Sequence, residues 1–297
     1  MKKKAFVYIV FAGLLWGTSG IFVHFLAPYG FTSLQMTCVR AVVSFVCLGG
    51  YAFFRDRTLF RIKPRQLLLC IGAGAGIFLT ASCYYTAMQM TSVSTAVVLM
   101  YTAPVYVAVI SALFLGEKFS RLKLVSIVGI LIGSILVSGC IGDLKFDLLG
   151  ILIGVLSGIT YAAYNLLTKL ALRQGCRAVS VTVYSFGAMA VIAALVCQPL
   201  DIPVHAAAAP GITVPLLIGL GICTCVMPYF LYTLSMKELS AGTASALGIV
   251  EPMAATVYSV VFFREQLDIF SGSGIALILL SVVLLGKAEN GDSVAKN

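Results

Sequence analysis

Ten apolar segments divide this chain, and each is long enough to cross a lipid bilayer as an α-helix. They contain 19 to 26 residues, and about 20 residues span the hydrocarbon core. The segments are 5–26, 32–54, 66–88, 92–115, 122–140, 147–168, 178–198, 211–236, 241–263 and 268–286. Only 10% of the residues are charged, against about 25% in soluble domains. The pattern predicts an all-α polytopic membrane protein with ten transmembrane helices.

The basic residues fall almost entirely on one side of the predicted helices. With the N-terminus in the cytoplasm, 17 of the 20 Lys and Arg residues lie on the cytoplasmic side and two lie outside, while Arg40 falls within the second helix. Such a bias sets the orientation of membrane proteins. We therefore expect a multi-pass protein of the cell (inner) membrane with both termini cytoplasmic. The bias also accounts for the net charge of +9 without a nucleic-acid partner.

An internal repeat relates residues 91–119 to residues 239–267 at an offset of 148. The pairs that carry most weight are Tyr84 and Tyr232, Thr95 and Thr243, Pro104 and Pro252, and Glu117 and Glu265. Because five helices are an odd number, the second half enters from the opposite side of the membrane. The sequence thus predicts two inverted five-helix repeats, 1–142 and 143–287, followed by a cytoplasmic tail, 288–297. Inverted repeats are typical of secondary transporters.

Two charged residues lie deep inside predicted helices. Arg40 is eight residues from the outer start of the second helix, and Glu251 is twelve residues from the outer end of the ninth. At about 1.5 Å per residue these depths are about 12 and 18 Å, so the two side chains could meet. One interpretation is a structural ion pair. The other is a site in which Glu251 carries a proton or recognises a substrate ammonium.

Three prolines stand inside predicted helices. Pro104 and Pro252 occupy equivalent positions of the two repeats, and Pro228 lies in the eighth helix. Each removes one backbone hydrogen bond and kinks its helix. The kinks are interpreted either as hinges on which the repeats move or as static bends.

Aromatic and polar residues are frequent near the middle of several predicted helices. The residues expected to line the substrate or ion pathway are Trp16, Tyr101, Tyr161, Tyr164, Asn165 and Tyr229. Their polar groups need partners at that depth, which favours an internal cavity over lipid. His24, near the outer end of the first helix, is interpreted as interfacial. Glycines at GxxxG spacing, such as Gly13 and Gly17, indicate close helix packing, and the fifth and tenth helices are expected at the periphery.

The motifs of this chain resemble those of the EamA type of the drug/metabolite transporter superfamily. The residues that carry the resemblance are Leu15-Trp16-Gly17-Thr18-Ser19, Arg40, Tyr101 to Pro104, Leu115-Gly116-Glu117, Val250-Glu251-Pro252 and Arg264-Glu265. The resemblance implies ten helices, a central cavity between the halves and, often, efflux. Members are similar in motif while they handle amino acids, amines, sugars and other metabolites. One departure is Arg264, where the first repeat has Gly116.

These observations favour a secondary transporter, an exporter of an amino acid or related zwitterion by alternating access. The alternatives are a small multidrug/amine or sugar-type facilitator of the same fold, a channel, or an intramembrane enzyme. The sequence lacks HExxH, GxSxG and phosphate-loop motifs, which argues against an enzyme or an ATP-driven pump. We expect no catalytic residues, no metal and no cofactor. The expected partners are a small-molecule substrate and the lipid bilayer, with the chain a monomer or homodimer.

Overall fold

The computed structural model describes residues 2–91, 93–116, 120–137, 147–197, 199–264 and 269–294, and within these ranges it is helical without a strand. Eight helices in this part of the chain are long and apolar enough to cross a membrane. They are Lys3–Tyr29, Ser33–Arg55, Pro64–Met90, Thr95–Phe114, Leu148–Arg173, Ala178–Val196, Pro210–Ser235 and Ala241–Phe262. The fold is therefore that of a multi-pass helical membrane protein. The fifth and tenth predicted segments correspond to α7 (Arg121–Val137) and α15 (Ile269–Val294), whose apolar part, Gly272–Leu285, is shorter.

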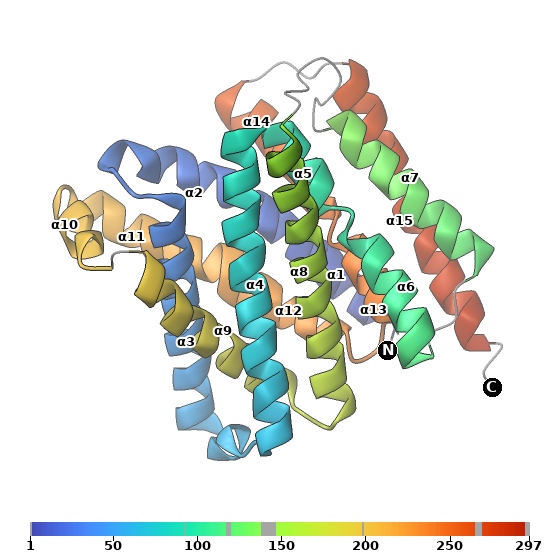
Figure 1. Cartoon of the computed structure of the whole chain (residues 1–297), viewed down its shortest axis with the longest axis horizontal. Helices are drawn as coiled ribbons and strands as arrows, with labels where there is room; N and C mark the ends of the chain where they lie inside the picture. The colour runs from blue at the N-terminus through green and yellow to red at the C-terminus, as the bar shows by residue number, and fades with distance from the viewer. Residues whose placement is uncertain are drawn as a thin grey trace.

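The remaining elements follow the predicted segments in order (Figure 1). The α-helices are α1 (Lys2–Gly17), α2 (Ser19–Leu26), α3 (Ser33–Arg55), α4 (Pro64–Met90), α5 (Val93–Met100), α6 (Ala103–Leu115), α8 (Leu148–Arg173), α9 (Ala178–Val196), α10 (Asp201–Ala207), α11 (Pro210–Gly221), α12 (Met227–Ser235), α13 (Ala241–Leu247) and α14 (Val250–Phe263). Short helical turns are η1 (Ala27–Tyr29) and η2 (Arg57–Phe60), and η3 (Ile222–Val226) is a π-helical segment. Several predicted helices are thus divided near their middle.

Two of these divisions lie next to the equivalent prolines. Pro104 stands at the second residue of α6 and has no N–H for the Met100 carbonyl, so the helix is interrupted between α5 and α6. In the later repeat, α13 ends at Leu247 and α14 begins at Val250, two residues before Pro252. The Glu251 amide donates to the Gly248 carbonyl three residues back, at 3.1 Å, instead of four. Both helices are therefore discontinuous, a form that creates binding sites at the membrane midplane.

Two further irregularities have other causes. At Thr18 both the backbone N–H and the hydroxyl donate to the Leu15 carbonyl, at 3.1 and 2.7 Å, and α1 gives way to α2. A side-chain hydroxyl that competes for backbone carbonyls in this way weakens the regular helix. The π-helical segment η3 precedes Pro228, the second residue of α12, which cannot donate to the Thr224 carbonyl. The eighth segment is thus bent where Pro228 predicts a kink.

Glycines allow the helices to approach closely. A Cβ atom on Gly13 would lie 2.9 Å from Val250 Cβ, and one on Gly17 would lie 2.7 Å from Ala254 Cβ, so α1 packs directly on α14. Because lipid offers no hydrophobic driving force for helix association, contacts of this kind carry the packing. The helices α7 and α15 pack against each other in the same manner through Gly133 and lie at one side of the molecule (Figure 1).

The two half-helices α6 and α14 end alike. Gly116 follows α6 with φ 62° and ψ 28°, and Arg264 follows α14 with φ 56° and ψ 30°. Both angles lie in the left-handed region, which is common for glycine and uncommon for arginine. Arg264 therefore adopts the backbone conformation of its glycine counterpart. The glutamates of the repeat, Glu117 and Glu265, lie outside the described residues.

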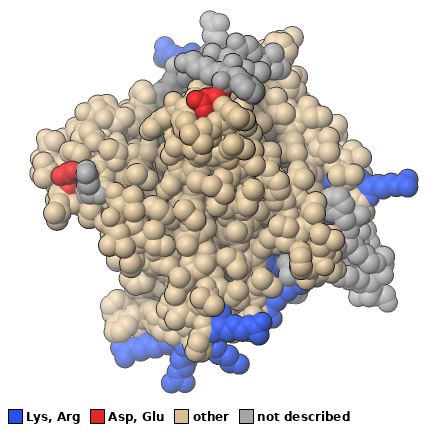
Figure 2. Space-filling view, in the orientation of Figure 1, with Lys and Arg blue, Asp and Glu red and all other residues tan. Residues whose placement is uncertain are grey.

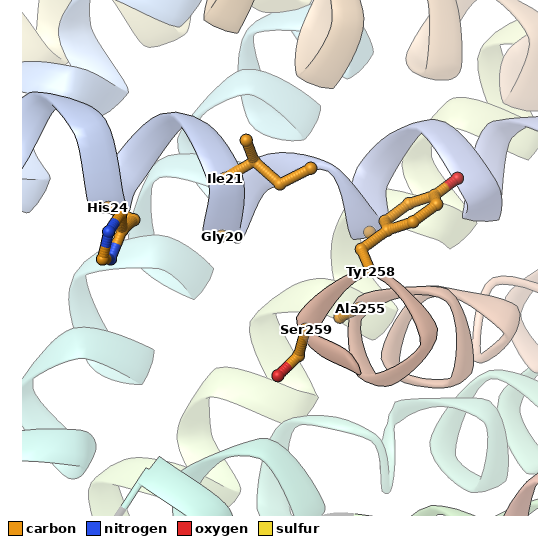
Figure 3. Close-up of a pocket in the computed structure, with 7 residues that line it drawn as sticks. Gly20, Ile21, His24, Ala255, Tyr258 and Ser259 are labelled. Atoms are coloured by element: carbon orange, nitrogen blue, oxygen red, sulfur yellow. The ribbon is translucent and has the colours of Figure 1, made fainter. Parts of the chain in front are cut away.

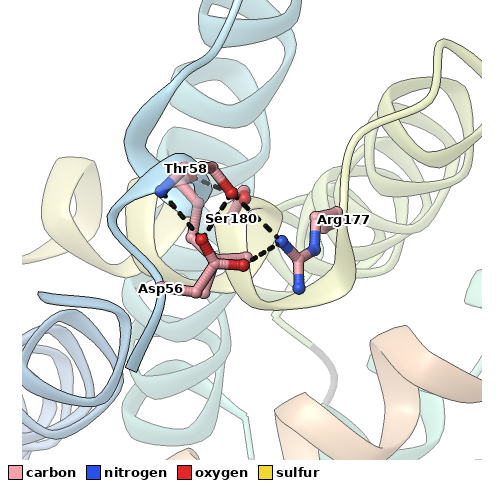
Figure 4. Close-up of polar contacts among 5 residues, drawn as sticks. Asp56, Thr58, Arg177 and Ser180 are labelled. Atoms are coloured by element: carbon pink, nitrogen blue, oxygen red, sulfur yellow. Dashed lines mark hydrogen bonds and ion pairs between the residues drawn. The ribbon is translucent and has the colours of Figure 1, made fainter. Parts of the chain in front are cut away.

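The side predicted to be cytoplasmic carries a cluster of polar contacts between two connections. Asp56 accepts hydrogen bonds from the Thr58 backbone and hydroxyl and pairs with Arg177 at 2.5 Å, while the Ser180 hydroxyl donates to the Leu59 carbonyl (Figure 4). The bonds from Thr58 and the guanidinium lower the pKa of Asp56 to about 2. The carboxylate thus stays ionised at neutral pH and ties η2 to the start of α9. Lys and Arg side chains gather along this edge of the molecule (Figure 2).

Candidate functional site

Arg40 and Glu251 lie near enough to influence each other electrostatically, but they form no ion pair within the described residues. Arg40 lies on α3 beside Cys225 and Tyr229, and Glu251 lies in the first turn of α14 beside Tyr101. The two charges interact electrostatically, yet within the described part of the chain neither has an oppositely charged side-chain atom within 4.0 Å. Both side chains are half-buried. Each charged side chain thus keeps part of its surface accessible.

The local structure offsets part of the cost of burying a negative charge at Glu251. This residue is the second of α14, where the unpaired N–H groups of a helix start give a partial positive charge. Gly13 allows α1 to cover the backbone here, because a Cβ atom on it would already lie 3.3 Å from the Glu251 amide nitrogen. The carboxylate also interacts with the hydroxyls of Tyr84, Tyr101 and Tyr161. The break at Pro252 therefore provides a helix start beside Glu251, and this helix start offsets part of the cost of burying the carboxylate.

Five aromatic side chains from three helices form a continuous wall. The Trp16 ring lies 4.9 Å from Tyr229 and 5.3 Å from Tyr232. Tyr164 lies 5.8 Å from Tyr229, 6.5 Å from Tyr232 and 6.0 Å from Tyr161. These are centroid separations at which aromatic rings attract one another. The wall stands beside both charges, since Tyr229 interacts with Arg40 and Tyr161 with Glu251.

Asn165 holds two tyrosines of this wall in place through hydrogen bonds. Its side chain is fully buried, its amide nitrogen donates to the Tyr161 carbonyl at 2.7 Å, and its amide oxygen accepts a hydrogen bond from the Tyr232 hydroxyl. Asn165 is therefore a positioning residue that connects α8 to α12. Tyr232 is not among the residues predicted for the pathway, yet it is fully buried in the wall. The sequence signal for it is its spacing of three residues from Tyr229, which places both on one face of the helix.

Some buried donors of the site have no protein partner. The Trp16 indole nitrogen and the Arg40 Nε atom are buried and make no hydrogen bond within the described residues. Trp16 is only 4% exposed. Buried polar groups in folded proteins are nearly always satisfied, so these two donors are open to a bound molecule or to water.

The structure thus brings together every residue that the sequence suggests for the pathway. Arg40, Glu251 and the aromatic wall are contiguous, with Tyr101 against Glu251. The three prolines border the same region, because each lies within three residues of Tyr101, Glu251 or Tyr229. Their predicted role as hinges stays a prediction.

One end of the site is closed by helix packing and by two buried lysines. The half-helices α6 and α13 pack together. Beside them, Lys123 Nζ donates to the Ser240 hydroxyl at 2.7 Å, and Lys169 Nζ donates to the Leu239 carbonyl at 2.6 Å and to the Met236 carbonyl. The lysines are only 3% and 8% exposed. They therefore do more than set topology: they hold the connection between α12 and α13.

The opposite end is less tightly packed. The half-helices α5 and α14 continue α6 and α13 toward the other side. In the described part of the chain they are not packed against each other as closely as α6 and α13 are. On the far flank of α14, a pocket of about 280 Å³ separates it from α2 (Figure 3). The site is thus closed at the end that carries the lysines and more open at the other.

The site contains no constellation suited to a metal. Among the described residues, no group of three or more His, Cys, Asp or Glu side chains could hold an ion. The cysteines of this part of the chain are free thiols. The polar groups at the site are one carboxylate, one guanidinium, several phenols and one indole, and groups of these kinds can bind and orient a polar small molecule.

Comparisons with known proteins agree with this geometry. The EamA-like transporter family matches the chain twice, at residues 3–139 and 148–287. An uncharacterized transporter of Archaeoglobus fulgidus is 30% identical over 276 residues, which cover 93% of this chain and 94% of that protein. The uncharacterized transporter YwfM of Bacillus subtilis is 26% identical, with 98% and 96% covered.

A solved crystal structure is similar over nearly the full length. It superposes with a TM-score of 0.82 at 17% identity and covers 98% of this chain and 99% of the other. At that identity the likeness establishes the fold alone.

Proposed function

The chain belongs to the EamA-like transporter family, and from this premise we propose that it is a secondary transporter that exports a small zwitterion, such as an amino acid, across the cell membrane. The observation that carries the substrate class is the pair of opposite charges, Arg40 and Glu251, which influence each other electrostatically, are half-buried and, among the described residues, form no ion pair.

A zwitterion satisfies both charges at once. Its ammonium binds the Glu251 carboxylate beside Tyr101, and its carboxylate binds the Arg40 guanidinium, which is suited to bidentate recognition. Each charge is costly inside a membrane while it lacks a partner. The aromatic wall then contacts the side chain of the substrate. A cationic amine would pair with Glu251 but leave Arg40 unmatched, and a neutral sugar would leave both unmatched, which places these alternatives second.

Several observations support ten transmembrane helices in two inverted repeats. The family matches the chain in two halves, and the helix breaks before Pro104 and Pro252 correspond at the offset of 148. The helix contacts are also preserved when the halves are exchanged. Exchange turns the α4–α8 contact into the α12–α1 contact and leaves the α3–α9 and α7–α15 contacts in place.

The difference between the two ends supports alternating access. In an inverted repeat the two halves can exchange conformations, so an arrangement closed at one end implies a second arrangement closed at the other. Here α6 and α13 close the end with the lysines, whereas α5 and α14 stand apart. The breaks at Pro104 and Pro252 divide each helix between these ends and are the proposed hinges.

Counterflow in liposomes tests the proposal. The purified protein is reconstituted, vesicles are loaded with one unlabelled metabolite at a time, and uptake of the labelled form is measured with and without a pH gradient. We expect exchange of one or more amino acids. Loss of one charge-assisted hydrogen bond costs about 1.5–3 kcal/mol, so Arg40→Ala and Glu251→Gln should each reduce exchange roughly 10- to 100-fold.

Two controls separate recognition from folding. Arg65→Ala, a change at an exposed basic residue, should leave exchange unchanged. The double variant Arg40→Glu with Glu251→Arg should stay inactive, since an oriented substrate cannot bind with its charges exchanged. Recovery of exchange in that double variant would show a structural ion pair and contradict the assigned roles. Absence of counterflow with every metabolite would overturn the proposed function.

A further inference from the structure

A dense group of basic residues lies where α3 ends and α4 begins. Residues 55–65 contain five Lys or Arg residues and one acid, Asp56. Asp56 already takes part in the polar contacts that tie η2 to α9 (Figure 4), so the stretch keeps a net positive charge. Three of its basic residues, Arg55, Arg57 and Arg61, have exposed side chains and are called the arginine cluster below. Lys and Arg side chains gather along this edge of the molecule (Figure 2).

The backbone that carries the arginine cluster is fixed by contacts with the second half of the chain. Leu59, in η2, is only 2% exposed, and its carbonyl accepts a hydrogen bond from the Ser180 hydroxyl at 2.7 Å. The next carbonyl, that of Phe60, accepts a hydrogen bond from the Tyr184 hydroxyl at 2.9 Å. The like charges are therefore held close together, and a bound anion relieves their mutual repulsion.

The arginine cluster is continuous with apolar surface at the end of a membrane-spanning helix. Phe53 and Phe54 lie in the last turn of α3 and are 49% and 88% exposed. The Arg57 guanidinium carbon lies 4.3 Å from the centre of the Phe53 ring, and Arg57 Nε donates to the Phe53 carbonyl at 3.4 Å. Arg57 thus turns back toward the membrane-spanning part of α3. This places a cation beside exposed rings at the membrane boundary, where phospholipid headgroups lie.

From these observations we propose that the arginine cluster binds the headgroup of an anionic phospholipid, whose acyl chains lie against Phe53 and Phe54. Guanidinium groups bind phosphate oxygens through two parallel hydrogen bonds, a geometry that a lysine ammonium does not match. Anionic lipids give the cytoplasmic leaflet its negative surface potential, and the bias of basic residues predicts that the cluster lies on this side.

The lipid site is separate from the candidate functional site. Fifteen residues of α3 lie between Arg40 and Arg55, a distance of about 22 Å along the helix at about 1.5 Å per residue. The proposal therefore does not depend on which substrate is transported.

Two other anions match this surface less well than a phospholipid. Inorganic phosphate pairs with guanidinium groups but leaves the rings of Phe53 and Phe54 uncovered. A nucleic acid stays in water, so it requires arginines that extend away from the membrane, whereas Arg57 turns back over Phe53. In a phospholipid the phosphate pairs with the arginines while the acyl chains bury the rings, and both contributions favour binding.

Lipid binding to the purified protein tests the proposal. The protein, in a neutral detergent, is titrated with phosphatidylglycerol or with phosphatidylcholine of the same acyl chains, and bound lipid is measured by native mass spectrometry. We expect phosphatidylglycerol to bind at least about tenfold more tightly and to raise the midpoint of thermal unfolding, as a ligand of the folded state does. Salt at about 0.5 M should reduce the difference, because it screens the arginines.

A triple variant and a matched control locate the effect. The triple variant is Arg55→Gln, Arg57→Gln and Arg61→Gln. Each lost charge is worth about fivefold in affinity, so the preference for phosphatidylglycerol should fall at least about tenfold. The control removes three exposed basic residues elsewhere on the side predicted to be cytoplasmic and should keep the preference: Lys4→Gln, Arg121→Gln and Lys237→Gln.

The site is contradicted if the parent protein binds both lipids with equal affinity, or if both triple variants lose the preference alike. An equal rise in the unfolding midpoint with inorganic phosphate, or with a single-stranded oligonucleotide, at the same concentration would also overturn it. Because binding is measured on the parent protein, the comparison of the two lipids stays decisive even where a variant fails to fold. Absence of counterflow would overturn the proposed function and leave the lipid site intact.

Discussion

At the scale of single residues, Arg264 shows how the repeat constrains backbone conformation more strongly than side-chain identity. It ends α14 at φ 56°, as Gly116 ends α6 at φ 62°. For an L-residue with a Cβ atom the left-handed region costs roughly 1–2 kcal/mol. Glycine avoids this cost but loses more chain entropy on folding. Arg264 is therefore a strained position in the described structure.

Relief of this strain is a testable prediction. Arg264→Gly should stabilise the protein by up to about 1 kcal/mol and raise the midpoint of thermal unfolding in detergent. Gly116→Ala, the opposite change at the equivalent position, should lower the midpoint by a similar amount. Fluorescence-detected unfolding of the three proteins measures both. A lower midpoint for Arg264→Gly would mean that the exposed arginine side chain contributes more than its backbone costs.

The sequence indicates which residues belong to the candidate site better than it indicates which of them contact one another. Arg40 and Glu251 are evident as deep charges, because few charged residues occur inside apolar segments. Whether they pair could not be predicted, since a rise per residue gives depth but not the lateral distance across a bundle. Lys123 and Lys169 were assigned to topology by their position, yet both are buried on the connection between α12 and α13. Lysine stems can follow apolar surface for several ångströms, which periodicity does not reveal.

At the scale of elements, Lys169 joins α8 to the connection that precedes α13. Its ammonium donates to the Met236 and Leu239 carbonyls, and hydrogen bonds from charged donors are worth about 1.5–3 kcal/mol. Lys169→Met keeps the length of the side chain but removes the donor. We expect it to favour the arrangement that is open at this end by roughly 10- to 100-fold.

Limited proteolysis measures this shift. The exposed Lys237 lies in the connection itself, so trypsin should cleave after it at least about five times faster in Lys169→Met than in the parent. Lys63→Met, at an exposed basic residue of another connection, is the control and should leave the rate unchanged. Equal cleavage rates in all three proteins would show that Lys169 stabilises the fold without closing this end.

The helix breaks differ in how far they could be predicted. Those beside Pro104 and Pro252 follow from the missing N–H of proline, and the repeat indicates that both exist. The break at Thr18 has no such signal, because a threonine inside a helix usually donates to a carbonyl without interrupting it. In the structure, the Thr18 hydroxyl competes for the Leu15 carbonyl and Gly17 packs against α14, and both contacts lie where the chain turns. The pocket beside α2 was for this reason not predicted.

At the scale of the whole molecule, the repeat offset of 148 residues predicts which helices are equivalent, but not which end is closed. An inverted repeat can adopt two arrangements with equivalent contacts between its halves. Their free energies differ because the two halves differ in sequence, for example at Lys169 and in the residues that pack α6 against α13. Local patterns in a sequence specify each helix. The choice between arrangements depends on contacts between residues far apart in the chain.

Opposite orientation of the two halves is the prediction that tests the architecture as a whole. Alkaline phosphatase is active only outside the cytoplasm, and green fluorescent protein folds best inside it. Fused after Gly142, between the halves, phosphatase should be active and the fluorescent protein dark; fused after Lys287, the results should be reversed. Five crossings separate the two fusion sites, and an odd number must exchange their sides. The same reporter result at both sites would require an even number of crossings in the second half, and the pairing of α6 with α14 as inverted counterparts would then be wrong.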